Sequence, residues 1–316
     1  MEINEILDNE LKQKTYRVEY LEYHITNFIG YQYKNTTKEN YKHPLQKFNK
    51  YILSTPIVEL REDNINQTVK QYRNYLDKST NLKTSSIDNY ITVLRVFLNQ
   101  HLNLQTNRVK KLDTGKDTKP KYIPLDDIIG LVNTVELLTG NPELITRDKA
   151  IICTLFGAGL RVSELMNIEQ NDYINENGVN YLFVQGKGTG KGNKKPIAIP
   201  DKTADHINEY LHQRNQHNRS CKYLFCSYTD KQLTRQAVNK NIKKYAKEYD
   251  KRNGKNISSR VTTHTFRHSL ARYLLVDKGV PISQVKDILR HSNIETTAKY
   301  LTNSQEEIQE LRLNIF

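Results

Sequence analysis

Tryptophan is absent from the 316-residue chain, and cysteine occurs only three times. Cys153, Cys221 and Cys226 form no Cys-x-x-Cys pair, and their odd number argues against a disulfide framework and against a structural zinc site. Such cysteine usage fits a reducing compartment, so we expect a cytoplasmic protein. Abundant Lys, Asn, Ile and Tyr without Trp indicate an AT-rich coding sequence, which is typical of a low-GC bacterium or its mobile element.

Long apolar runs are also missing from the chain. No apolar stretch approaches the roughly 20 residues that a membrane-spanning helix needs. The acidic N-terminal run Met1-Glu2-Ile3-Asn4-Glu5 contains no apolar segment of the kind that secretory signals have. We therefore expect no membrane partner.

The charge balance is strongly basic, with 48 Lys and Arg against 35 Asp and Glu, which gives a net charge of +13. Both halves of the chain share this excess, as expected of a protein that grips DNA from two sides; the alternative is that lysine only aids solubility. The length is about twice that of a typical domain, so two domains are expected.

Residues 1–112 are predicted to form a bundle of four or five helices. Apolar residues recur there at helical spacing in the stretches 41–53, 69–76 and 86–98. Ser85 and Ser86 are candidate caps of the last helix. Residues 113–122 have no apolar period and are rich in lysine, which predicts a basic linker.

Residues 123–316 combine helical and β-prone segments. Two helices are predicted at 147–156 and 162–168, separated by the turn Gly157-Ala158-Gly159. Short β-prone runs at 180–184 and 196–199 are joined by a turn rich in Gly and Lys, and the remainder is mainly helical.

Two arginines, two histidines and a tyrosine in this half are candidates for phosphate chemistry. Arg161 follows the glycine turn at the start of a helix, where backbone N–H groups favour an anion. His264 and Arg267 are spaced to share one helix face, and His291 precedes Tyr300. The planar arginine fork suits a phosphate, and tyrosine is a plausible nucleophile where cations favour its phenolate.

These residues resemble the signature motifs of the tyrosine recombinase (phage integrase, Xer-like) family. The matching motifs, in order along the chain, are Gly159-Leu160-Arg161-Val162-Ser163-Glu164, the Lys187 segment, His264-x-x-Arg267-His268, and Leu289-Arg290-His291-Ser292-Asn293 followed by Tyr300. The resemblance implies a mainly α fold with a small β-sheet, in which residues 1–112 are a helical core-binding (SAM-like) domain and residues 123–316 an α+β catalytic domain.

The resemblance also implies a mechanism. Tyr300 attacks a scissile phosphate and forms a 3′-phosphotyrosyl bond, while Arg161, Arg267 and His291 stabilise the charge on the non-bridging oxygens. His264 assists as a candidate base, and Lys187 protonates the leaving oxygen. No cofactor and no metal are implied. The expected partners are double-stranded DNA and further copies of the chain, as a tetramer on paired recombination sites.

Two positions depart from the family pattern. The lysine motif occurs twice in the turn, so counting from the incoming strand selects Lys187 and counting back from the outgoing strand selects Lys191; we favour Lys187 because a strand end positions a side chain more firmly than a loop tip. Arg290 stands where the family usually has glycine, and a phosphate contact is one interpretation of it. Glu164 is a candidate salt-bridge partner for an arginine.

Alternative functions remain open at this level. Type IB topoisomerases share this chemistry but relax any supercoiled duplex as monomers, and a non-catalytic DNA-binding protein of recombinase descent is a second alternative. His264 and His268 have the spacing of zinc ligands, but no Glu follows the first histidine as in His-Glu-x-x-His, so we expect no metal site.

Overall fold

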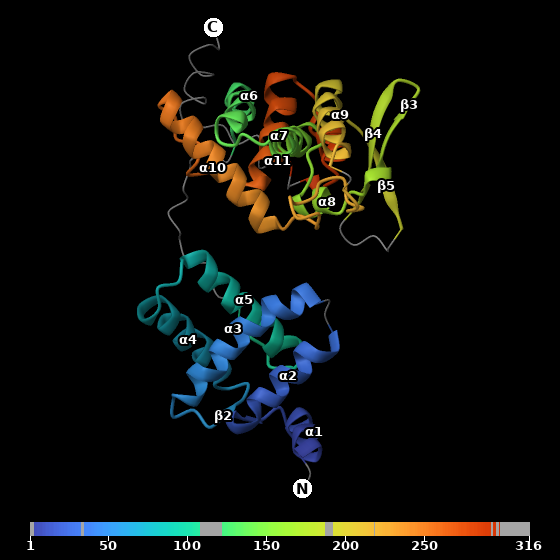
Figure 1. Ribbon diagram of the computed structural model, residues 1–316. Coiled ribbons are helices and arrows are strands. Elements are labelled where there is room, and N and C mark those ends of the chain that lie inside the picture. Colours follow the sequence, from blue (N-terminus) through green and yellow to red (C-terminus); the bar gives the residue numbers. More distant parts are fainter. Residues whose placement is uncertain are drawn as a thin grey trace. The chain divides into compact units, whose positions relative to one another are not determined.

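In a computed structural model, the chain divides into two compact units, residues 1–117 and 118–316, and each is described here by itself (Figure 1). The structure describes residues 3–32, 35–107, 122–186, 192–217, 219–291, 293–294 and 297. In these ranges, no helix has the length and apolar character needed to span a membrane.

The first unit is a helical bundle (Figure 1). Its elements are α1 (Ile3–Gln13), β1 (Tyr16–Arg17), η1 (Val18–Tyr20), α2 (Leu21–Gln32), α3 (Asn35–Leu53), β2 (Glu59–Leu60), α4 (Ile65–Ser79) and α5 (Thr84–Gln100). The two short strands pair antiparallel, with Tyr16 opposite Leu60. The five helices of the described part agree with the predicted bundle.

Helix α5 shows why the apolar period located these elements. Its apolar residues at helical spacing are all buried in the core of the first unit: Ile87, Tyr90, Ile91, Leu94, Phe97 and Leu98. The predicted caps Ser85 and Ser86 are wrong. The helix begins at Thr84, because the extended Lys83 already accepts hydrogen bonds from the backbone N–H groups of Ser86 and Ile87, so both serines lie inside the first turn.

The second unit packs seven α-helices of the described part with one small sheet (Figure 1). Its elements are α6 (Leu125–Thr134), η2 (Val135–Leu137), α7 (Pro142–Gly157), α8 (Val162–Met166), η3 (Gln170–Asp172), β3 (Tyr173–Glu176), β4 (Val179–Gln185), β5 (Lys194–Ala198), α9 (Asp201–Asn215), α10 (Arg235–Asn253), α11 (Thr263–Arg272), η4 (Tyr273–Asp277) and α12 (Ile282–Ile288). The predicted helices 147–156 and 162–168 correspond to α7 and α8.

The sheet has the antiparallel order β3-β4-β5, with Glu176 opposite Val179 and Gln185 opposite Lys194. The strands β4 and β5 were predicted, whereas β3 was not. The turn that joins β3 to β4 consists of Asn177 and Gly178, which both have positive φ (52° and 80°). An Asn-Gly pair at positive φ is the preferred two-residue hairpin turn, so this dipeptide marks the missed strand.

Helix α7 lies at the centre of the second unit and is fixed to α10 by a buried carboxylate. Asp148 accepts hydrogen bonds from Arg147 Nε at 2.8 Å, from Asn241 at 3.0 Å and from the Tyr245 hydroxyl at 2.5 Å. Burial, followed by the Asp148 charge, raises the pKa of Tyr245. A buried carboxylate is stable only when it is paired and hydrogen-bonded in this way.

The turn after α7 places the next segment against α11 and α12. Gly159 has φ +56°, and a Cβ atom at this residue would lie 2.9 Å from the Cδ2 atoms of both Leu270 and Leu289. The backbone conformation and the lack of space both require glycine. The segment that leads into Arg161 therefore lies directly against α11 and the end of α12.

Candidate active site

Four of the six predicted site residues lie in the described part of the second unit. Arg161 immediately precedes α8, His264 and Arg267 lie on α11, and His291 follows α12. Lys187 and Tyr300 lie outside the described residues. The structure brings the four described residues together from three separate segments, as the following contacts show.

Arg267 joins the three segments. It is 4% exposed, and its guanidinium donates to the carbonyl oxygen of Gly159 at 2.5 Å and to that of Leu289. Its Nε lies 3.4 Å from Nε2 of His291. The turn before Arg161 and the turn before His291 are thus held on the same cation.

His291 is 8% exposed, and its Nδ1 lies 2.9 Å from the hydroxyl of the fully buried Thr297. Burial is the largest cause that lowers the pKa of His291, to about 4, and the positive charge of Arg267 and then of Arg161 adds to it. The imidazole is therefore neutral near pH 7. Thr297 was not predicted as a site residue, although the sequence has a hydroxyl residue three positions before Tyr300.

His264 is exposed at the N-terminal end of α11. Partial desolvation, followed by the charges of Arg235, Arg161 and Arg267, lowers the pKa of His264. Arg235 is the first residue of α10, so a fourth segment contributes positive charge to this site. A neutral imidazole has a nitrogen lone pair that can accept a proton, while the nearby cations weaken its basicity.

Glu164 orients Arg161, which confirms the predicted salt bridge. The Glu164 carboxylate accepts from Nη1 of Arg161 at 2.7 Å and from its backbone N–H at 3.0 Å. Burial alone would raise the pKa of Glu164, but the Arg161 backbone hydrogen bond and the charges of Arg290 and Arg161 lower it below its usual value. The Arg161 side chain remains 29% exposed, so it is available to a ligand.

Arg290 is the residue after the C-cap of α12 and has φ +57°. The N–H of His291 bonds to the carbonyl of Lys286 and the N–H of Arg290 to that of Asp287, which is the pattern of a Schellman motif. Glycine is preferred there, and a side chain in the left-handed region costs about 1–2 kcal/mol. This explains the glycine usual in the family. The predicted phosphate contact of Arg290 stays a prediction.

Arg161 and Arg267 form a cationic site together with the neutral histidines His264 and His291. The charges of Arg161 and Arg267 both act on His264 and on His291. Guanidinium groups bind phosphate oxygens through charge-assisted hydrogen bonds, and a prearranged set of such donors stabilises a phosphoryl transition state. The charge and the donors of this site suit a phosphate group.

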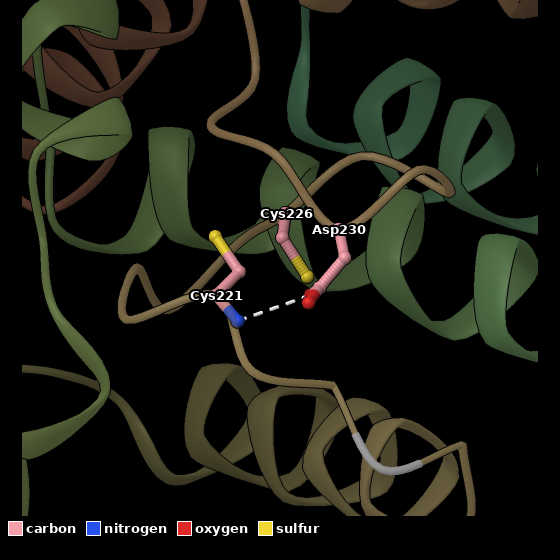
Figure 2. Close-up of side chains that lie close together, drawn as sticks. All are labelled: Cys221, Cys226 and Asp230. Carbon is pink, nitrogen blue, oxygen red and sulfur yellow. Dashed lines mark hydrogen bonds between the residues drawn. The ribbon is translucent and has the colours of Figure 1, made fainter.

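A separate cluster consists of Cys221, Cys226 and Asp230, whose ligand atoms lie within 4.8 Å of one another (Figure 2). The Asp230 carboxylate already accepts from the N–H and hydroxyl of Ser220 and from the N–H of Cys221. The buried guanidinium of Arg214 donates to the Cys221 carbonyl and opposes the binding of a cation nearby. These contacts give the three residues a structural role in the loop between α9 and α10.

Two family profiles match the chain. The Phage integrase family matches residues 121–307, and the Phage integrase SAM-like domain matches residues 18–106. Tyrosine recombinase XerD of Staphylococcus haemolyticus is 30% identical over 284 residues, which cover 86% of this chain and 89% of the relative. Tyrosine recombinase XerA of Thermococcus kodakarensis is 30% identical over 258 residues, or 77% of this chain and 86% of the relative.

Solved structures share the fold. A post-cleavage complex of the XerH site-specific recombinase with a palindromic difH substrate has a TM-score of 0.68 at 19% identity, covering 88% of this chain and 79% of that chain. The Tn1549 transposon integrase in complex with transposon right end DNA also has a TM-score of 0.68, at 17% identity, covering 94% of this chain and 98% of that chain.

The predicted fold class, mainly α with a small sheet, a SAM-like part and a recombinase-type part, is confirmed by these matches. The family profile spans more than half of the chain, and XerD is similar over most of its length. The chain therefore belongs to the phage integrase family and is a tyrosine-type site-specific DNA recombinase.

Proposed function

We propose that this recombinase cuts and rejoins duplex DNA through a covalent bond between Tyr300 and a 3′ phosphate. The observation that supports this mechanism is the meeting of Arg161, Arg267, His264 and His291 in one cationic site. The Tyr300 oxygen attacks the scissile phosphorus, and the bond from phosphorus to the 5′ oxygen breaks. The phosphodiester energy is kept in the new bond, so neither ATP nor a metal ion is required.

Each described residue has a role in this step. Arg161 and Arg267 neutralise the charge that develops on the non-bridging oxygens. Arg267 Nε donates to Nε2 of the neutral His291, so the ring proton lies on Nδ1 and is donated to the Thr297 hydroxyl. These two contacts hold His291 beside the same oxygens. His264, neutral because its pKa is lowered, accepts the proton of the Tyr300 phenol.

Lys187 protonates the departing 5′ oxygen. The reaction then runs in reverse, with the 5′-hydroxyl of a partner strand attacking the phosphotyrosyl bond. Tyrosine is regenerated, and the two strands are recombined. The same residues therefore serve both cleavage and rejoining.

The two parts of the chain act on DNA together in this proposal. Residues 1–112 form the core-binding domain, residues 113–122 the basic linker, and residues 123–316 the catalytic domain, and four copies assemble on paired sites. Helix α10 supports contact with phosphates, because five of its basic residues are exposed: Arg235, Lys240, Lys243, Lys244 and Lys247. The family relatives do not favour the topoisomerase alternative.

Formation of a covalent adduct tests the mechanism. The full chain is incubated in excess EDTA with a nicked substrate whose site has been located by footprinting genomic fragments that flank the gene. We expect an SDS-resistant protein–DNA adduct and no relaxation of an unrelated supercoiled plasmid. Absolute dependence on a metal ion, or relaxation without site preference, would overturn the proposed mechanism.

The C-terminal tail is expected to connect assembly to cleavage. Its apolar residues Ile308, Leu311 and Ile315 have the spacing of one helix face, on a segment too short to be stable alone. Docked on a neighbouring copy, the tail would link four subunits. Removing residues 308–316 should leave half-site binding nearly unchanged, weaken cooperative filling of a full site and abolish recombination.

Gel-shift titrations measure both quantities for the truncated chain. Unchanged cooperativity would mean that the tail does not join subunits. Loss of half-site binding would mean that the tail belongs to the core of its own domain, which is the intramolecular alternative.

A further inference from the structure

Arg290 has an unfavourable backbone conformation, and its guanidinium makes several contacts within the protein. Its Nη2 lies 3.2 Å from Oε2 of Glu164, and its Nη1 donates to the carbonyl oxygen of Ile288 at 3.2 Å. Longer contacts of 3.4 Å reach the carbonyl oxygens of Ala158 and Gly159. The side chain thus lies against the turn that precedes Arg161, and only 22% of it is exposed.

We propose that Arg290 is a positioning residue that acts on Arg161 through the shared carboxylate of Glu164. This inference rests on the proposed function, because it assigns Arg161 to the scissile phosphate. This role explains why an arginine occupies a position where the backbone prefers glycine. It requires no direct contact between Arg290 and DNA.

The reason lies in how one negative charge is divided between two cations. Glu164 is 5% exposed, and its Oε1 binds Nη1 of Arg161 while its Oε2 binds Nη2 of Arg290. Were Arg161 the only cation on this carboxylate, the pair would be close to neutral and would attract a phosphate weakly. Because Arg290 takes up part of the charge, Arg161 keeps its positive potential.

Geometry acts in the same direction. Among the residues that the structure describes, Arg161 makes its side-chain hydrogen bond to Glu164 through Nη1 alone, so the rest of its fork is available to a ligand. Arg290 restrains Oε2 of Glu164, and Arg267 and Arg290 share the Gly159 carbonyl. Both ends of the turn that carries Arg161 are therefore tied to the segment that carries His291.

Single-turnover cleavage of a nicked substrate tests the inference, with the variants Arg290→Gly and Arg290→Lys in the full chain. Glycine suits φ +57°, so the fold is retained. We expect Arg290→Gly to slow cleavage about tenfold to a hundredfold, with half-site affinity and its salt dependence unchanged. Arg290→Lys should restore part of the rate, since it returns the charge without the fork.

A double-mutant cycle with Glu164→Gln separates action through Glu164 from any independent effect. Arg290→Gly should have little further effect on the cleavage rate once Glu164 is neutral. Asn177→Gly is the matched control: it relaxes another positive-φ residue, in the β3–β4 turn, and should cleave at the parental rate.

Three results would overturn the inference. The first is a parental cleavage rate in Arg290→Gly. The second is an equal loss in the Glu164→Gln background. The third is a fall in half-site affinity with a salt slope shallower by about one unit, which would identify Arg290 as a phosphate contact. Failure of the proposed function is distinguishable from these, because the parent chain itself would then form no adduct.

Discussion

The Tyr300→Phe variant is expected to bind its site like the parent and to form no SDS-resistant adduct. Phenylalanine keeps the ring but lacks the oxygen that would form the phosphotyrosyl bond, so cleavage is abolished while the contacts that hold DNA remain. Tyr300 follows the buried Thr297 by three residues, and the Thr297 hydroxyl is bound to His291. The proposed nucleophile is therefore only three residues along the chain from a contact of His291.

Gel-shift titration and an SDS gel of the same reactions measure binding and covalent attachment. Tyr228→Phe is a suitable control, because Tyr228 is 58% exposed in the second unit and should not affect the adduct. An adduct that persists in Tyr300→Phe would show that another residue is the nucleophile. Loss of binding in that variant would place the Tyr300 hydroxyl among the DNA contacts.

The helices and the charged groups of the site were predictable from the sequence because they depend on local patterns. The period of α5 is a property of neighbouring residues, and each of its predicted apolar positions is buried. Arg161, Arg267 and His291 were identified through motifs whose order along the chain is visible without a structure. The structure adds that Arg267 bonds to the two turns next to the other residues.

Features that depend on distant residues were not predictable. Asp148 joins Asn241 and Tyr245, which are more than ninety positions away in the chain, and no local pattern indicates this pairing. The departure from glycine at Arg290 was visible, whereas its contact with Glu164 requires the end of α12 to lie against the turn after α7. Strand β3 is different, because the pair Asn177-Gly178 did indicate a hairpin.

The second large expected effect concerns the general acid in the segment between β4 and β5, where the lysine motif occurs twice. Strand β4 ends at Gln185 and β5 begins at Lys194, directly opposite it in the sheet. Lys187 follows the strand end by two residues, while Lys191 precedes the next strand by three. A side chain close to a strand end is positioned more firmly, so we expect Lys187 to reach the 5′ oxygen.

Lys187→Ala should therefore slow cleavage by about 10²–10⁴-fold, the usual contribution of a general acid, and Lys191→Ala should slow it only mildly. Both variants remove one positive charge from the same turn, so each controls for the electrostatic effect of the other. Replacing the leaving 5′ oxygen with sulfur removes the need for a proton, because a thiolate departs unaided. The sulfur substrate should restore the rate of Lys187→Ala and leave the ratio of Lys191→Ala to the parent unchanged. Rescue of Lys191→Ala instead would assign the acid to the second copy of the motif and would shift the register of the turn.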